Sequence, residues 1–246
     1  MRLFIEKLIR RIYTGYLFPY TRISYSQNGE DIIIKDLFAR LGISRPTYLD
    51  IGANEPFYIS NTYLLYSKGS SGVCIEPNFY LFKKFRKKRK RDICIHAGIA
   101  FNNLTEADFY QFPKKANGLG TFSKEEAEFW ENSGNERIGK FKIESIIKTK
   151  LVNVNEVMGQ YFSPHPNFVS LDVEGLDLAI LNTIDFDRFK PEVFCIETIG
   201  YTANNKEKKN IDINSFLESK GYFLYADTFI NSIFCRKDSY KSLDFE

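Results

Sequence analysis

The stretch that most constrains the fold of this chain is residues 48–56, a short apolar strand that ends in an acid and a glycine turn. Such a stretch is typical of an open α/β sheet, in which ligands bind at the carboxyl ends of the strands. It lacks the Gly-x-Gly-x-x-Gly pattern that cradles a pyrophosphate. A ligand with ribose and adenine but no phosphates fits better, which favours S-adenosylmethionine (SAM). A turn that binds no ligand is the alternative for Asp50 and Gly52 taken alone.

Five parallel strands are expected, at residues 47–51, 72–78, 92–96, 167–172 and 192–196. Four of them end in a carboxylate. Their acids are Asp50, Glu76, Asp172 and Glu197, and parallel strands bring such ends to one edge of a sheet. Glu76 follows Gly52 by 24 positions, which fits an acid that binds ribose hydroxyls from the neighbouring strand. The alternative is that these acids lie on the surface and have no function. Their position at one edge of the sheet favours a common ligand-binding crevice instead.

Length and composition favour one α/β domain. The chain has 246 residues, of which 43% are hydrophobic and 26% charged, as in ordinary globular domains. Two last strands, expected at 222–226 and 232–236, are separated by a short turn and should pair antiparallel. The sequence therefore predicts a Rossmann-like, mostly parallel seven-stranded sheet with a C-terminal antiparallel hairpin, in a domain over residues 25–246.

Charge, apolar runs and cysteines exclude several classes of protein. The formal net charge of +3 is too small to indicate a specific nucleic-acid partner. No apolar run approaches the roughly 20 residues of a membrane span, and no secretory signal is seen. The cysteines are Cys74, Cys94, Cys195 and Cys235, each inside a predicted strand. Without a Cys-x-x-Cys pair they predict no zinc site, buried thiols and a cytoplasmic location.

Residues 2–13 predict a basic amphipathic helix within an N-terminal helical extension over residues 1–24. Such a helix can make peripheral contact with an anionic membrane surface. The favoured alternative is a helix that packs on the domain or on a second subunit, which would give a homo-oligomer.

Two charged segments admit both a structural and a functional interpretation. Glu30 and Asp31 open a predicted helix, either as ordinary first-turn acids or as contacts to a cationic ligand, and we expect Glu30 to touch the cofactor. Residues 83–91 form a nearly continuous basic run on a crossover helix. A solvated helix face is favoured for this run, and binding of phosphates or an anionic polymer is the alternative.

Residues 102–150 interrupt the regular alternation of strands and helices. A long insertion in a compact domain is usually functional, so these residues are expected to form part of an acceptor pocket or a lid. Residues 142–155 hold two β-like runs around a Lys-Thr-Lys segment and predict a hairpin. Just before the insertion, Ala97 and Gly98 at a strand end leave room for a flat adenine ring.

Five segments together resemble the FkbM family of SAM-dependent methyltransferases. They are residues 26–31, 49–54, 74–78, 171–175 and 196–197. The resemblance runs from about residue 25 to residue 236. It implies the class I methyltransferase fold, SAM as cofactor, and O-methylation, often of sugar hydroxyls in glycans or natural products.

The resemblance also implies roles for individual residues. Asp50, Gly52 and Asn54 would line the methionine portion of SAM, and Glu76 would bind its ribose. Ala97 and Gly98 would lie at the adenine. Two neighbours in the matching segments, Ala53 and Pro77, complete the expected cofactor site together with Glu30 and Asp172.

The hypothesis for the chemistry is an in-line displacement of the sulfonium methyl group by an acceptor hydroxyl. A carboxylate base should assist, with Asp172 as first choice, Glu174 second and Glu197 third. Asp172 and Glu197 sharing a divalent cation is an alternative that we do not favour. Two other classes stay open: a nucleotide-sugar- or NAD-binding α/β protein, and a non-catalytic protein whose basic helix binds an anionic polymer.

Overall fold

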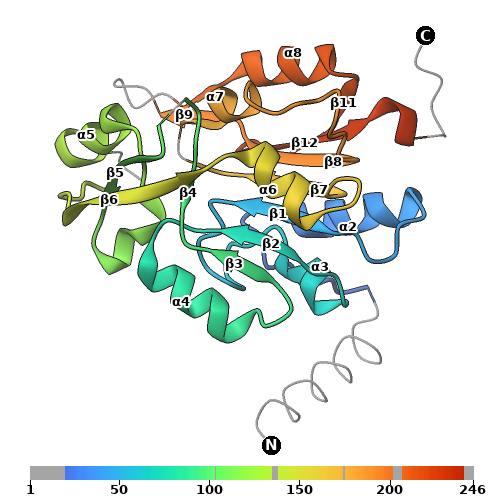
Figure 1. The fold of residues 1–246 in the computed structure, drawn as a ribbon, viewed down its shortest axis with the longest axis horizontal. Coiled ribbons are helices and arrows are strands. Elements are labelled where there is room, and N and C mark those ends of the chain that lie inside the picture. Colours follow the sequence, from blue (N-terminus) through green and yellow to red (C-terminus); the bar gives the residue numbers. More distant parts are fainter. Residues whose placement is uncertain (1–19, 103, 135–137, 174, 202–206, 241–246) are drawn as a thin grey trace, which may run out of the picture.

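The computed structural model describes residues 20–102, 104–134, 138–173, 175–201 and 207–240. The helix predicted at residues 2–13 lies outside these residues. In the described part, a central sheet carries helices on both faces, and a smaller sheet stands at one end (Figure 1).

The central sheet has seven strands in the order β11-β12-β8-β7-β1-β2-β3. The strands are β1 (Tyr48–Ile51), β2 (Gly72–Ile75), β3 (Ile93–Ile95), β7 (Phe168–Leu171), β8 (Val193–Glu197), β11 (Tyr222–Asp227) and β12 (Asn231–Arg236). Strand β12 pairs antiparallel with β11 and β8, and the other pairs are parallel. Strand β1 lies between β2 and β7, so the strand order reverses there. The predicted Rossmann-like sheet with its C-terminal hairpin is confirmed.

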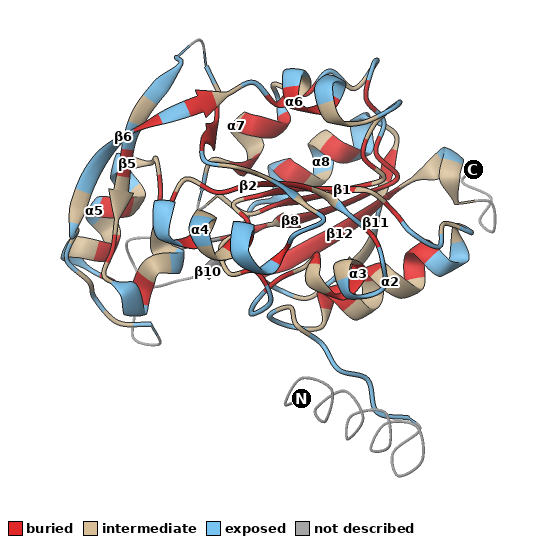
Figure 2. Cartoon of the chain, turned by 60° about the horizontal axis from the view of Figure 1, so that its bottom comes forward, coloured by how far each residue is buried: buried red, intermediate tan, exposed pale blue. Residues whose placement is uncertain are grey.

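Apolar side chains fill both faces of this sheet. The covering helices are α2 (Glu30–Arg40), α3 (Tyr63–Ser67), α4 (Phe79–Lys88), α6 (Val154–Tyr161), α7 (Asp177–Leu181) and α8 (Ile211–Ser219). Leu49 and Ile51 of β1 pack with α6, α7 and α8, whereas Tyr48 packs with α2, α3 and α4. Buried residues follow the central strands and the inner sides of the helices (Figure 2). Because successive residues of a strand face opposite ways, Asp50 shares the face of Tyr48.

The insertion forms a second sheet and a helix of its own. Its elements are β4 (Gly98–Ile99), β5 (Glu106–Gln111), the 3-10 helix η2 (Lys114–Leu119), α5 (Lys124–Asn132) and β6 (Ser145–Val152). The hairpin predicted at residues 142–155 is wrong, because β6 is one continuous strand that pairs antiparallel with β5. Lys148, which suggested a turn, instead forms an ion pair with Asp108 on β5 at 3.1 Å.

Two short strands, β9 (Ile199–Tyr201) and β10 (Glu207–Lys209), form an antiparallel ribbon after β8. The helices of the described ranges are all too short or too polar to cross a membrane. All four cysteines lie in central strands as predicted and are free, three of them buried.

Candidate functional site

A pocket opens at the carboxyl ends of β1, β2 and β7. It holds about 910 Å³ of space, part of it open to solvent, a size that suits a small-molecule ligand. Nine predicted cofactor residues line it: Asp50, Gly52, Ala53, Asn54, Glu76, Pro77, Ala97, Gly98 and Asp172. They come together because neighbouring parallel strands end at the same edge of the sheet. Their individual roles stay predictions.

The turn after β1 requires glycine at position 52. Gly52 has a φ of +76°, and a Cβ there would lie 1.8 Å from the carbonyl oxygen of Asp172. The ends of β1 and β7 approach this closely only because the side chain is missing. Asn54 follows with a positive φ of 52°, which Asn adopts more readily than most residues. Its Oδ1 atom is buried without a hydrogen-bond partner in the described structure, so the pocket wall holds an unused acceptor.

Glu76 is fixed at the pocket wall by backbone donors. It is 5% exposed, and its carboxylate accepts hydrogen bonds from the N–H groups of Asn54 and Asn78, both at 2.7 Å. Burial raises the pKa of Glu76 to about 8, although the two N–H donors favour the charged form. The two N–H groups occupy only part of the acceptor capacity of the Glu76 carboxyl group, which keeps positions for further donors such as ribose hydroxyls.

Asp50 is held from the side opposite the pocket. The Thr62 hydroxyl donates to Asp50 Oδ2 at 2.6 Å. Burial raises the pKa of the Asp50 carboxyl to about 6, while the Thr62 hydroxyl and the charge of Arg89 lower it. Thr62 therefore fixes a carboxylate that lines the pocket.

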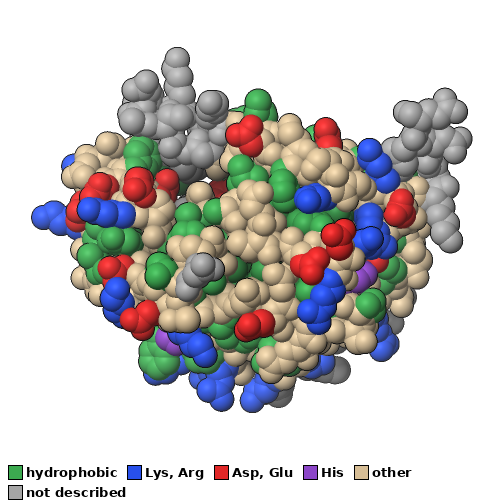
Figure 3. Space-filling model, turned by 45° about the horizontal axis from the view of Figure 1, so that its top comes forward, with side chains coloured by type: hydrophobic (Ala, Val, Ile, Leu, Met, Phe, Trp, Pro, Cys, Tyr) green, Lys and Arg blue, Asp and Glu red, His purple; other side chains and the backbone are tan. Residues whose placement is uncertain are grey.

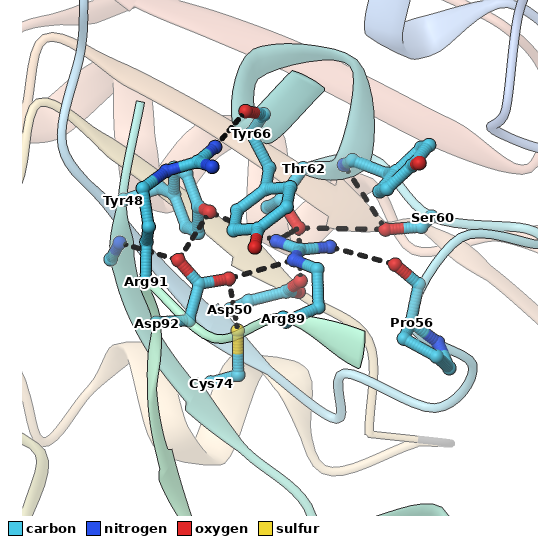
Figure 4. Close-up of polar contacts among 12 residues, drawn as sticks. Tyr48, Asp50, Pro56, Ser60, Thr62, Tyr66, Cys74, Arg89, Arg91 and Asp92 are labelled. Carbon is cyan, nitrogen blue, oxygen red and sulfur yellow. Dashed lines mark hydrogen bonds and ion pairs between the residues drawn. The ribbon is translucent and has the colours of Figure 1, made fainter. Parts of the chain in front are cut away.

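A buried arginine stands behind Thr62 (Figure 4). The Arg89 guanidinium donates to Asp92 Oδ2 at 2.7 Å, to the Pro56 carbonyl at 2.9 Å, and to the hydroxyls of Tyr48 and Thr62 at 3.0 Å each. Its charge is compensated by Asp92, since both side chains are 0% exposed and form an ion pair. The other basic residues of the run are exposed or half-buried, as predicted for a solvated face, and Arg89 is the exception. The helix ends at residue 88, and the chain turns Arg89 inward toward these acceptors.

Asp172 and Glu197 form a hydrogen-bonded pair of carboxyl groups. Asp172 follows β7, and Glu197 ends the neighbouring β8. Their side chains are joined by a hydrogen bond. Burial raises the pKa of Asp172 to about 6. The hydrogen bond to Glu197 acts against this rise, and the negative charge of Glu30 adds to it. Glu174 lies outside the described residues.

Glu30 does not line the described pocket, although it was predicted to touch the cofactor. It is fully buried and accepts hydrogen bonds from the Asn28 N–H at 2.8 Å, the Thr228 hydroxyl at 2.6 Å and the Asn231 amide at 3.1 Å. Burial alone would raise the pKa of Glu30, but these donors outweigh it and the pKa is lowered. The residue joins the start of α2 to β12. Asp31 likewise accepts hydrogen bonds from residues 24–26.

The insertion builds the opposite wall of the pocket. Its lining residues are Phe109, Asn117, Gly118, Gly120, Thr121 and Phe122. A Cβ on Gly98 would lie 2.4 Å from the Phe122 ring. The Phe122 ring therefore packs directly against the backbone of Gly98, where a side chain would not fit.

Three side chains of the site escaped prediction from the sequence. Asp177 is 4% exposed and accepts a hydrogen bond from the Val173 N–H at 3.3 Å. Burial and the charge of Asp172 raise the pKa of Asp177 well above its usual value. An acid at the start of a helix just after Gly175 was the available signal. Thr62 carried no signal, because its partners Asp50 and Arg89 are 12 and 27 positions away. Arg89 was overlooked because it lies among exposed basic residues, although its partner Asp92 is only three positions away.

A family model described as the methyltransferase FkbM domain matches residues 50–224, more than half of the chain. The chain belongs to the FkbM family of SAM-dependent methyltransferases. The resemblance predicted from the sequence segments is thereby confirmed, and with it the class of enzyme and the cofactor. A comparison with curated proteins found no match.

Several solved methyltransferases have a similar but distant structure. The FkbM methyltransferase of Methylobacillus flagellatus KT is 12% identical, with a TM-score of 0.42 over 89% of this chain and 46% of that chain. The present chain thus spans about half of its length. A putative caffeoyl-CoA O-methyltransferase from Staphylococcus aureus is 11% identical, with a TM-score of 0.44 over 93% of this chain and 90% of that one. Magnesium protoporphyrin IX methyltransferase from Synechocystis PCC 6803, with bound SAM, is 9% identical, with a TM-score of 0.41 over 94% and 96%.

The polar groups that line this pocket suit SAM, the cofactor of FkbM-family enzymes. SAM carries an ammonium group and ribose hydroxyls as donors and has no phosphate. The unused Asn54 Oδ1 and the carboxylates of Asp50 and Glu76 are acceptors for such donors. The turn after β1 has no glycine-rich phosphate cradle.

Proposed function

We propose that this protein methylates a hydroxyl group of a sugar, in a glycan, a polysaccharide or a glycosylated metabolite. The proposal starts from the resemblance of this chain to the FkbM family, which implies O-methylation. The observation that carries it further is the Asp172–Glu197 pair at the SAM pocket. A sugar hydroxyl is a poor nucleophile until its proton is removed, so such an acceptor needs a base at this position.

Asp172 accepts the hydroxyl proton in this mechanism. Its raised pKa of about 6 makes it a stronger base than an exposed aspartate and leaves it largely unprotonated at neutral pH. Glu197 holds the Asp172 carboxyl through their hydrogen bond. A base of this kind contributes roughly 10²–10⁴ in rate, and correct positioning of the acceptor contributes more. Glu174 is the second candidate for the base.

The strand ends hold the cofactor in this proposal. SAM supplies an electrophilic methyl group on a sulfonium centre. Asp50 and Asn54 bind its methionine portion, and Glu76 binds the ribose hydroxyls. Ala97 and Gly98 contact the adenine, and the Phe122 ring beside Gly98 encloses that end of the pocket. Gly52 lets the two strand ends meet beneath it.

The insertion shapes the acceptor side of the pocket in this proposal. Its residues form the wall opposite the strand ends, so an acceptor that reaches Asp172 passes between the two walls. Closing the pocket from water strengthens the interactions inside it. Residues 102–150 therefore decide which sugar is methylated.

The remaining assignments concern location and partners. We propose a cytoplasmic enzyme, which the four unpaired cysteines support. For the helix predicted at residues 2–13 we propose packing on the domain or on a second subunit, with peripheral contact to a membrane surface as the alternative. No specific nucleic-acid partner is proposed, since the formal charge is only +3.

Mass spectrometry of glycans incubated with SAM and the protein tests the proposal. We expect the mass gain of one CH₂ group on a sugar oxygen, and a far smaller yield of this product with Asp172→Asn in the same time. A methyl group found on nitrogen or carbon would contradict O-methylation. Activity that survives exhaustive treatment with a chelator supports the base, and activity that disappears and returns with Mg²⁺ supports a cation shared by Asp172 and Glu197.

A further inference from the structure

Basic side chains on α4 stand over aromatic rings at regular intervals. Three rings are each followed four positions later by a cation: Phe79 by Lys83, Tyr80 by Lys84, and Phe82 by Arg86. The distances from the cation to the ring centre are 4.1 Å, 4.9 Å and 5.8 Å in that order. These six residues, with Lys87 and Lys114, are called the α4 ridge. Among the cations, Lys83 and Lys87 are four positions apart and lie on one side of the helix, and Lys84 and Arg86 flank them.

The α4 ridge begins at the mouth of the pocket. The Lys114 ammonium, on η2 of the insertion, lies 5.7 Å from the Tyr80 ring centre. The same η2 contributes Asn117 and Gly118 to the pocket wall. The ridge is thus continuous with the opening through which an acceptor enters.

Most of these cations have no acidic partner. Helix α4 contains no acidic residue, and within the described ranges only Lys84 of the ridge forms an ion pair, with Glu55 at 2.5 Å. Lys and Arg side chains gather along the lower edge of the molecule, where α4 lies in Figure 1 (Figure 3). Contacts with the rings restrain these long side chains, which lowers the entropy lost when they bind an anion.

We propose that the α4 ridge binds the acceptor, a sugar chain that carries phosphate or carboxylate groups. Its anionic groups pair with the ridge cations while a nearby hydroxyl enters the pocket. This inference rests on the proposed sugar O-methylation and adds the charge of the substrate. Nucleic acid fits less well, because the bases would need ring faces for stacking, and Lys83, Lys84 and Lys114 already lie over them.

Binding of fluorescently labelled polymers to the full chain tests the ridge. The probes are polygalacturonate, phosphorylated dextran and neutral dextran, each followed by fluorescence anisotropy at about 50 and about 200 mM salt. Polygalacturonate carries carboxylate groups and phosphorylated dextran carries phosphate groups, so comparing their affinities shows which anion the ridge binds. The wild type should bind at least one of them, more weakly at high salt, and should not bind neutral dextran. The double variant Lys83→Glu, Lys87→Glu should bind about tenfold more weakly or worse.

A matched control separates the ridge from general charge. Lys190→Glu, Lys220→Glu makes the same charge change at two exposed positions near the opposite edge of the sheet, and Lys220 also lies over a ring, at 5.5 Å from the Phe216 centre. Its affinity should stay within about twofold of the wild type. Equal losses in both variants, binding of neutral dextran, or tighter binding of single-stranded RNA or anionic vesicles than of either charged polysaccharide would overturn the proposal.

The SAM-induced shift in melting temperature distinguishes this inference from the proposed function. Both double variants should keep the shift, which shows that the fold and the cofactor pocket are intact. A wild type that binds the charged polysaccharide but shows no shift would refute the methyltransferase proposal while leaving the ridge standing. A normal shift without polysaccharide binding would refute the ridge alone.

Discussion

The two walls of the pocket are built in different ways. Asp50, Glu76 and Asp172 stand at the ends of buried parallel strands and are held by hydrogen bonds from Thr62, from backbone N–H groups and from Glu197. The opposite wall comes from the insertion, whose β6 leaves the side chains of Ile146 and Ile147 exposed to solvent. We therefore expect the sheet to fix the cofactor side and the insertion to set the acceptor preference.

Paired glycine substitutions give the largest expected difference between the walls. Gly52→Ala places a Cβ 1.8 Å from a backbone oxygen at positive φ, whereas Gly118→Ala meets only the Asn54 amide nitrogen at 3.2 Å. Gly52→Ala should destabilise the protein by at least about 2 kcal/mol and abolish the SAM-induced melting shift. Gly118→Ala should keep the shift. Similar melting curves for the two variants would show that the walls do not differ in rigidity.

Asp172→Asn should lower kcat by roughly 10²–10⁴ while SAM affinity stays within about threefold of the wild type. The amide keeps the shape of the side chain but cannot accept the hydroxyl proton. Thr121→Val on the insertion wall is the control and should change the KM for the acceptor more than kcat. Steady-state kinetics and calorimetric titration with SAM measure both quantities. An unchanged kcat in Asp172→Asn removes this residue from the mechanism.

The pH dependence of the reaction should report the same carboxyl pair. Burial raises the pKa of Asp172 to about 6, and a general base works only when unprotonated. The value of kcat/KM should therefore rise as pH increases through about 6, falling about tenfold per pH unit on the acid side. The apparent pKa belongs to the Asp172–Glu197 pair, so Glu197→Gln should shift it. A flat profile between pH 5 and 7, taken as approximate limits, contradicts the assignment.

Thr62→Val should weaken SAM binding by about tenfold, because Asp50 loses the hydroxyl that donates a hydrogen bond to it and fixes its position. Thr62→Ser should restore the affinity. Tyr48→Phe is the matched control, since the Tyr48 hydroxyl bonds Arg89 and Asp92 in the same network. It should lower the melting temperature and leave SAM affinity intact. Equal affinities for the Thr62→Val protein and the wild type would show that Thr62 serves stability alone.

The cofactor wall could be predicted from local sequence patterns. A strand that ends in an acid and a glycine locates Asp50 and Gly52, and the parallel arrangement then brings Glu76 and Asp172 to them. The predicted contact of Glu30 with the cofactor rested only on its place in a first helical turn. Two of its three hydrogen-bond partners, Thr228 and Asn231, lie just before and at the start of β12, about 200 residues away in sequence.

The arginine network and the insertion could not be predicted in this way. Arg89 looks like its exposed neighbours in the basic run, and its burial depends on Asp92 and on the Pro56 carbonyl, which the turn after β1 supplies. In the insertion, the polar Lys148 indicated a turn. A strand with one solvated face shows the same local polarity, and only its pairing with Asp108 on β5 distinguishes the two.

Calorimetric titration with S-adenosylhomocysteine, the demethylated cofactor, tests most directly whether the strand ends form the cofactor site. The wild type should bind with measurable heat, and Glu76→Ala should bind about tenfold more weakly or worse, because it loses the carboxylate fixed by the Asn54 and Asn78 N–H groups. No heat with the wild type, or equal affinity in Glu76→Ala, would contradict a cofactor site at the ends of β1, β2 and β7.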